Sequence, residues 1–204
     1  MNKMLRLSLP LGAAFFVLVS GLLLVDASAA SSPPPPSGFV REGALLVTTL
    51  EDVVYTDGEC SLREAIQAAN TNLEVEDCGS GDVLTDTITF DVAGTITLTS
   101  QLSVTAGGPL VIDGGEVITT SGGGLEVIDG RLDLLNISVM KVGESPLINV
   151  GATVNISNSE FYENGGGGIS NFGIMQISGC QIHDNYRGIT NSGEIQSLST
   201  AGKL

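Results

Sequence analysis

The sequence predicts an all-β chain folded as a parallel β-helix, a solenoid of stacked coils, with one short α-helix near its N-terminal end. Apolar residues make up 42% of the 204 residues, 27 positions are glycine and none is tryptophan, so aliphatic side chains have to fill the core. Beyond residue 81, apolar and polar residues alternate with the period of two that is typical of strands. This alternation recurs in units of about 21 residues, which is the length of one solenoid coil.

The chain is strongly acidic. Its 8 Lys and Arg residues against 23 Asp and Glu residues give a formal charge of −15. This charge argues against nucleic acid as a partner, because binding to phosphates requires cationic surfaces. Charged residues are only 15% of the chain, and its apolar content is too high for a disordered acidic tail.

Residues 1–29 have the features of a secretory signal peptide. Lys3 and Arg6 precede an apolar stretch over residues 7–25, and small residues follow, so cleavage is expected after Ala29. A retained membrane anchor is the alternative, because the apolar stretch is long, although proline and glycine interrupt it. The mature protein is therefore expected to be exported and to have no membrane span after cleavage.

The segment after the signal peptide, residues 30–43, is a Pro- and Ser-rich linker. Export favours disulfides, and the chain has three cysteines, so one is left unpaired. Cys60 and Cys78 are close in sequence whereas Cys180 is distant, which favours a bridge between Cys60 and Cys78.

A short helix is predicted after the first of these cysteines. Ser61 and Glu64 form a capping box, in which each side chain hydrogen-bonds to the backbone of the other residue. Asn70 is expected to end the helix. The apolar stripe of this helix consists of Leu62, Ala65, Ile66 and Ala69. A helix this short is unstable alone, so the stripe has to pack against the β region.

Strands are expected on both sides of this helix. Before it, alternation runs from residue 44 through Leu46, Thr48 and Leu50. After it, a repeated motif begins at Ile148, Ile169 and Ile189, with spacings of 21 and 20 residues. Aliphatic positions recur with it: Val154, Met175 and Ile195; Ile156 and Ile177; Phe161 and Ile182. Such positions predict ladders inside a solenoid, with Gly and Asn at its turns.

Polar residues recur on the outward-facing side of the same repeats. Asp133, Asn155, Gln176 and Gln196 occupy equivalent positions in successive units. Such a column is either a structural ladder of amides or a surface for a ligand, and the sequence leaves both interpretations open.

The segment from Cys60 to Asn70 reads CSLREAIQAAN, and a second cysteine and the run DTITF at residues 86–90 follow it. These residues resemble the family named for its CSLREA N-terminal domain, over roughly residues 45–195. The family consists of exported bacterial surface proteins in which the motif precedes a right-handed parallel β-helix, often of the kind found in polymorphic outer-membrane proteins. The resemblance implies fold and location, and it supplies no catalytic residues, because the family has no assigned enzyme activity.

The resemblance divides the mature chain into an N-terminal capping region, residues 44–80, and β-helix repeats, residues 81–204. A solenoid leaves unpaired backbone at each end, so the helix, with Ser61, Glu64 and its apolar stripe, is assigned to a cap on the first coil. The repeat is lost after Leu198. We therefore expect a chain truncated at its C-terminus, either a fragment of a longer protein or one whose open last coil is covered by self-association.

The expected function is that of a secreted or cell-surface structural or adhesive module without catalysis, with cell-surface glycans or a host or neighbouring cell as partner. The alternative is a polysaccharide-binding or polysaccharide-cleaving protein similar to pectate lyases. Such a lyase needs carboxylates that hold Ca²⁺ beside a basic residue. Arg131 and Lys141 are not part of an acidic cluster in the sequence.

Two other features are candidates for chemistry. His183 and Asp184 align with Tyr162 and Glu163 one repeat earlier, so they are expected on the exterior of an ordinary turn. Cys180 is expected to be a small buried thiol. Neither is predicted to be catalytic.

Four acidic residues flank the predicted disulfide: Asp57, Glu59, Glu76 and Asp77. Bridging the cysteines brings these carboxylates together, and Ca²⁺ would relieve their repulsion. The preferred interpretation is a solvated acidic loop, and no cofactor or metal is otherwise expected.

Overall fold

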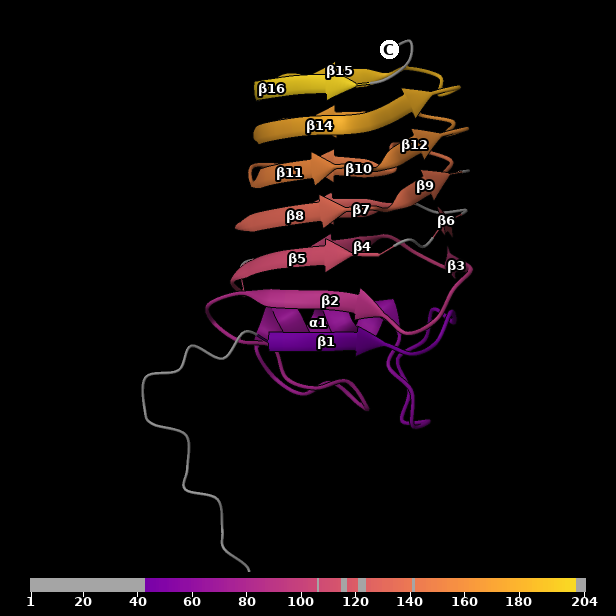
Figure 1. Ribbon diagram of the computed structural model, residues 1–204, viewed down its shortest axis with the longest axis vertical. Coiled ribbons are helices and arrows are strands. Elements are labelled where there is room, and N and C mark those ends of the chain that lie inside the picture. The colour runs from indigo at the N-terminus through magenta and orange to yellow at the C-terminus, as the bar shows by residue number, and fades with distance from the viewer. Residues whose placement is uncertain (1–42, 106, 115–116, 121–123, 141, 201–204) are drawn as a thin grey trace, which may run out of the picture. The chain divides into compact units, whose positions relative to one another are not determined.

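The computed structural model describes residues 43–105, 107–114, 117–120, 124–140 and 142–200. These residues form a solenoid of parallel strands with one α-helix, α1 (Leu62–Thr71), as Figure 1 shows. The predicted parallel β-solenoid is confirmed. The predicted signal peptide, nearly all of the linker and Lys141 lie outside the described residues. Within the described ranges, no helix is long and apolar enough to cross a membrane.

The strands stack into three ladders, and all pairings between them are parallel. The first ladder holds β1 (Gly43–Val47), β2 (Asp86–Phe90), β5 (Pro109–Asp113), β8 (Arg131–Leu135), β11 (Thr153–Ser157), β14 (Ile174–His183) and β16 (Glu194–Thr200). The second holds β3 (Thr95–Leu98), β6 (Val117–Thr120), β9 (Ser138–Met140), β12 (Glu160–Tyr162) and again β14. The third holds β4 (Leu102–Val104), β7 (Leu125–Val127), β10 (Leu147–Asn149), β13 (Ile169–Asn171) and β15 (Ile189–Asn191).

Aliphatic ladders fill the interior of the solenoid, as the alternation predicts. Val154 pairs with Leu132 on one side and with Met175 on the other, and all three side chains are buried. The predicted partners Phe161 and Ile182 are also paired and buried. In β1 the buried face is the opposite of the one that the alternation through Leu46 indicates: Leu45 is buried and Leu46 is 48% exposed.

The predicted alignment of Ile148 with Ile169 is wrong by one residue. Ile148 pairs with Ser170, and Leu147 is the buried residue at the position that Ile169 occupies one coil later. Two adjacent apolar residues leave the parity of a strand open, and a slip of one residue exchanges its faces. The spacing at this ladder is therefore 22 residues, since Asn149 pairs with Asn171.

The asparagine of the repeated motif was expected at a turn of the solenoid, but it lies at the end of a strand of the third ladder. Asn149 and Asn171 are buried and do not adopt the left-handed conformation; their side chains bind each other and the backbone of the turn that follows each of them. The corners between the first and second ladders are left-handed at Asn136, Asn158 and Gly179, with φ of 53°, 52° and 63°. Glycine is required sterically at Gly173 and Gly193, because an added Cβ would overlap the carbonyl oxygens of Ala152 and Gly173 respectively.

Candidate functional site around the helix and disulfide

Helix α1 begins with the predicted capping box. The Ser61 Oγ accepts from the Glu64 amide at 3.2 Å, and the Glu64 carboxylate accepts from the Ser61 amide at 2.8 Å. The helix runs past the predicted end at Asn70, because Asn72 is the C-cap, with a left-handed φ of 56°. The predicted stripe, Leu62, Ala65, Ile66 and Ala69, is buried, and α1 contacts β1, β2 and β4.

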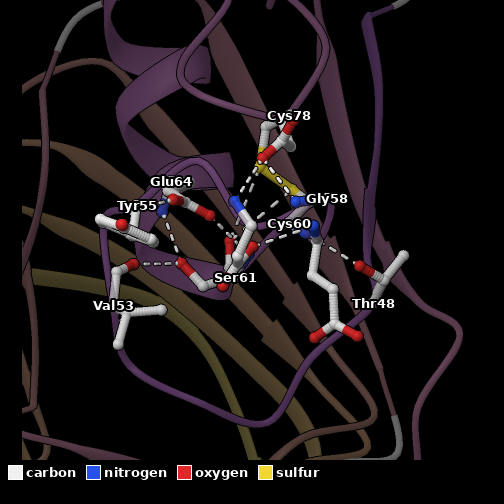
Figure 2. The surroundings of a disulfide bond; sticks show 11 residues. Thr48, Val53, Tyr55, Gly58, Cys60, Ser61, Glu64 and Cys78 are labelled. Carbon is white, nitrogen blue, oxygen red and sulfur yellow. Dashed lines mark hydrogen bonds between the residues drawn. A yellow bond between two sulfur atoms is a disulfide. The ribbon is translucent and has the colours of Figure 1, made fainter.

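The capping box also fixes the loop that precedes the helix (Figure 2). The Ser61 Oγ donates to the carbonyl oxygen of Val53 at 2.6 Å, and the buried Glu64 carboxylate accepts from the Tyr55 amide at 2.8 Å. Glu64 therefore satisfies two backbone donors, one in the helix cap and one in the loop. These bonds attach the loop to the first turn of α1.

Cys60 and Cys78 form the predicted disulfide, with their Cα atoms 4.9 Å apart. Figure 2 places it next to the start of α1, and both residues are buried. The backbone of Cys60 is bonded to Thr48, through the Cys60 amide to the Thr48 Oγ1 at 2.8 Å and the Thr48 amide to the Cys60 carbonyl at 2.9 Å. The bridge thus joins the chain leaving β1 to the segment beyond the helix.

Replacing both Cys60 and Cys78 with serine is expected to lower the free energy of unfolding by about 3 kcal/mol, because the open loop gains conformational entropy in the unfolded chain. Chemical denaturation of the variant and of the reduced wild type measures the loss, and the two should agree. An unchanged unfolding midpoint in both would contradict the prediction.

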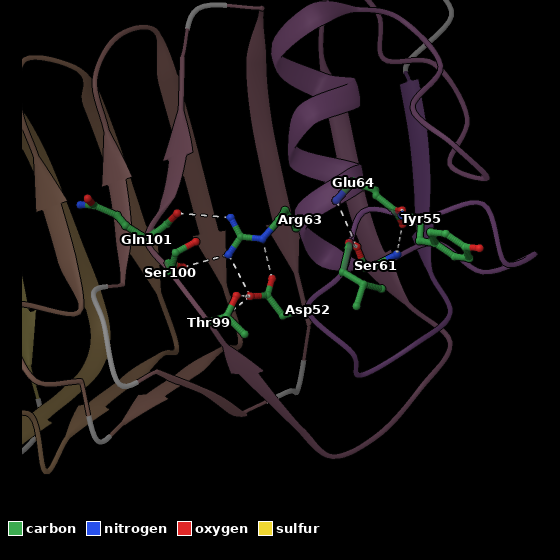
Figure 3. Close-up of polar contacts among 9 residues, drawn as sticks. Asp52, Tyr55, Ser61, Arg63, Glu64, Thr99, Ser100 and Gln101 are labelled. Atoms are coloured by element: carbon green, nitrogen blue, oxygen red, sulfur yellow. Dashed lines mark hydrogen bonds and ion pairs between the residues drawn. The ribbon is translucent and has the colours of Figure 1, made fainter.

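A buried ion pair links the helix to the second ladder (Figure 3). Arg63 binds Asp52 through two hydrogen bonds, from Nε at 2.7 Å and from Nη2 at 2.9 Å. Asp52 also accepts from the amide and hydroxyl of Thr99, at 2.6 and 2.7 Å. Burial alone would raise the pKa of Asp52, but the bonds from Arg63 and Thr99 together lower it.

Polar side chains of α1 also bind the backbone along β4, the end strand of the third ladder. Arg63 donates to the carbonyl oxygens of Ser100 and Gln101. Asn70 donates to the carbonyl of Ser103 and accepts from the amide of Thr105, both at 2.8 Å. These bonds attach α1 to the backbone of β4 and of the residues on either side of it.

Sequence reasoning missed Asp52, Thr99 and the contacts of Asn70. Arg63 lies in the first turn of a helix that packs against the core, and a positively charged side chain in that position requires an acidic partner. Nothing local identifies that partner, because Asp52 is 11 residues from Arg63 and 47 from Thr99.

Among the four acidic residues beside the disulfide, the carboxylates of Asp57 and Asp77 accept hydrogen bonds from the loop backbone. One Asp77 oxygen accepts from the amides of Asp57 and Gly58, both at 2.8 Å, and Asp57 accepts from the amide of Glu59 at 3.0 Å. Glu76 accepts from the hydroxyl of Thr56. Within the described part of the chain, no three His, Cys, Asp or Glu side chains are grouped so that they could hold a metal ion.

His183 lies on the exterior of the solenoid, between two acidic residues. Its Nδ1 is 2.8 Å from Asp184 and its Nε2 is 2.8 Å from Glu160 of the preceding coil, and its ring stacks on Tyr162. His183 pairs with Tyr162 as expected, and Asp184 has the same left-handed φ as Glu163. The bonds to Glu160 and then Asp184 raise the pKa of His183.

Stability should therefore depend on the charge of His183. Two carboxylates accept hydrogen bonds from both ring nitrogens only when the ring is protonated. The contribution of these bonds is present below the ordinary histidine pKa of 6.5 and is lost as the pH rises through the raised pKa. The wild type should exceed His183→Gln in melting temperature by more at about pH 5.5 than at about pH 8.5. Equal differences at the two pH values would contradict this.

Cys180 is fully buried and unpaired, as predicted. Burial raises the pKa of its thiol, and its Sγ lies 3.4 Å from the carbonyl oxygen of Ser178. A thiol with these properties is a poor nucleophile.

The predicted outward column is present on the first ladder. Asn155 donates to Asp133 at 2.6 Å, and Gln176 donates to Gln196 at 2.9 Å. A bulge places Ser197 opposite Gln176, yet the Gln196 side chain still reaches the column. Asp133 is also bound by Arg131, at 2.8 and 3.0 Å.

Comparison of the sequence with protein-family models found no match, and comparisons with curated proteins and with solved structures found none either.

Proposed function

We propose that this chain is a non-catalytic module of the exported, cell-surface type, with a structural or adhesive role and the right-handed coil of the CSLREA family that its motif resembles. Helix α1 and the disulfide serve as the cap of its first coil in this proposal. The bonds from Arg63 and Asn70 to the backbone beside β4 support the capping role, because they satisfy an edge that would otherwise be open to another strand.

The observation that carries the proposal is the bonding of exterior polar side chains to their equivalents in the next coil. Asn155 binds Asp133, Ser157 lies 3.1 Å from Ser178, and Gln176 binds Gln196. Such columns stabilise the stacking of coils and present a uniform surface. A polysaccharide lyase instead requires carboxylates and a base that converge on a substrate.

If the protein were a polysaccharide-cleaving enzyme, His183 would be the candidate for its catalytic base. Both of its ring nitrogens are held by carboxylates, so neither is free to accept a proton from a substrate. This engagement favours the structural interpretation of His183.

Two measurements test the proposal. Purified protein incubated with pectin, xylan, chitin and cellulose should release no new reducing ends or unsaturated products, and fluorescently labelled protein should be retained on cell surfaces. Protein with both Cys60 and Cys78 replaced by serine, unfolded before use, is the control for non-specific retention. Product that accumulates in proportion to the protein and disappears with His183→Ala would overturn the proposal.

A further inference from the structure

The outward face of the first ladder carries two columns of polar side chains that run across its strands. Figure 1 shows the strands concerned, β5, β8, β11, β14 and β16, stacked above one another. The amide column consists of Asp133, Asn155, Gln176 and Gln196. The serine column beside it consists of Ser157, Ser178 and Ser199. Strand pairing places the paired side chains of each column about 4.8 Å apart, and Gln196, which lies in the bulge, joins its column through its hydrogen bond with Gln176.

The columns retain hydrogen-bonding capacity toward solvent. A carboxamide has two N–H donors and a carbonyl with two lone pairs. The single bond between Gln176 and Gln196 uses one donor of the first and the acceptor of the second, and both side chains are exposed. Their remaining donors, and the Gln176 carbonyl, have no other hydrogen bond within the described residues. Each of the last two coils therefore offers free amide groups on this face.

The one charged residue of the amide column has an adjacent cationic partner. Arg131 neutralises Asp133 in the column. The chain as a whole carries a formal charge of −15, which repels polyanions. The amide and hydroxyl groups of the two columns are themselves neutral, so a ligand with hydroxyl groups that both donate and accept matches this face.

We propose that the amide and serine columns bind an extended, neutral polysaccharide whose chain lies along the solenoid axis. A β-1,4-linked hexopyranose chain in its extended form presents hydroxyl groups once per sugar, at a rise close to the spacing between strands. Successive sugars thus meet equivalent side chains in successive coils, and many weak contacts act together. Strands β5, β8, β11, β14 and β16 carry no Phe, Tyr or Trp for stacking on sugars, so affinity depends on this repetition. The inference rests on the proposed non-catalytic function and names its ligand.

The test uses co-sedimentation of the full chain with four insoluble or high-mass probes: crystalline cellulose, chitin, amylose and polygalacturonate. We expect depletion by cellulose or chitin, whose chains are extended and neutral, and none by helical amylose or acidic polygalacturonate. The double variant Gln176→Ala/Gln196→Ala should weaken binding by about tenfold. Both side chains are exposed, so the variant should remain folded, and circular dichroism verifies this.

The matched control is Gln181→Ala, which alters an exposed glutamine of the same strand, β14, in the part that belongs to the second ladder. Its affinity should equal that of the wild type. The inference is overturned if no extended neutral polymer is bound, if the double variant binds as tightly as the wild type, or if amylose and polygalacturonate bind equally well. Retention on cells without binding to polymers would refute this inference alone, whereas cleavage of a polymer would refute the proposed function.

Discussion

Replacing Asp52 with asparagine is expected to lower the free energy of unfolding by about 3–5 kcal/mol at neutral pH, which is the usual loss when one partner of a buried ion pair is removed. The Asp52 side chain is 1% exposed and that of Arg63 is 16% exposed, so water has little access to the guanidinium that loses its carboxylate. Asparagine has a similar volume, so the effect comes from the charge and the hydrogen bonds. Urea denaturation monitored by circular dichroism measures the loss.

The pH dependence of this loss identifies its cause. Because the pKa of Asp52 is lowered in the fold, its stabilising contribution is complete above the ordinary aspartate pKa and disappears as the pH falls through the lowered value. The difference between wild type and Asp52→Asn should therefore be full at about pH 6, begin to shrink below about pH 4, and be smallest once the pH is below the lowered pKa. Arg131, whose side chain is 54% exposed in its pair with Asp133, provides the control, because Asp133→Asn should cost about 1 kcal/mol or less. Equal losses for the two variants would contradict the assignment.

The solenoid itself could be predicted because its core obeys a local rule. Inward positions alternate with outward ones, so pairs such as Val154 and Met175 are recognisable from their spacing alone. The rule fails where two apolar residues are adjacent, as at Leu147 and Ile148, because either can face inward. There the pairing of Asn149 with Asn171 decides the register, and that pairing has no local signal.

In the helix region, the start of α1 and the disulfide could be predicted from the sequence, but the end of α1 could not. Its capping box involves residues three positions apart, and its disulfide joins the two cysteines nearest in sequence. The end of α1 was misplaced because Asn70, an apparent stop signal, instead uses its side chain to bind the backbone of Ser103 and Thr105. Asparagine favours helix ends through local bonds, and here a tertiary partner outweighs that preference.

Replacing Asn171 with leucine is expected to lower the free energy of unfolding by about 3–5 kcal/mol, because the buried amide of Asn149 and the partly buried backbone groups that Asn171 binds lose their partners at about 1–3 kcal/mol each. The Asn171 side chain accepts from Asn149 at 2.8 Å and donates to Asn191 at 2.7 Å, and it also donates to the carbonyl oxygens of Gly173 and Glu194 at 3.2 Å each. A leucine side chain is similar in size to that of asparagine, but it can form none of these hydrogen bonds. Thermal and urea denaturation measure the change.

The matched control lies in the same ladder one coil later. Asn191 is exposed, and water can replace its partners, so Asn191→Leu should cost about 1 kcal/mol or less. In a solenoid each coil contacts only its neighbours, so hydrogen exchange in Asn171→Leu should rise first in β13, β14 and β15 and remain slow in β2 and β5. Equal losses of stability in Asn171→Leu and Asn191→Leu would mean that the buried asparagine contributes no more to stability than the exposed one. The repeated asparagine would then serve the turn and not the stacking of coils.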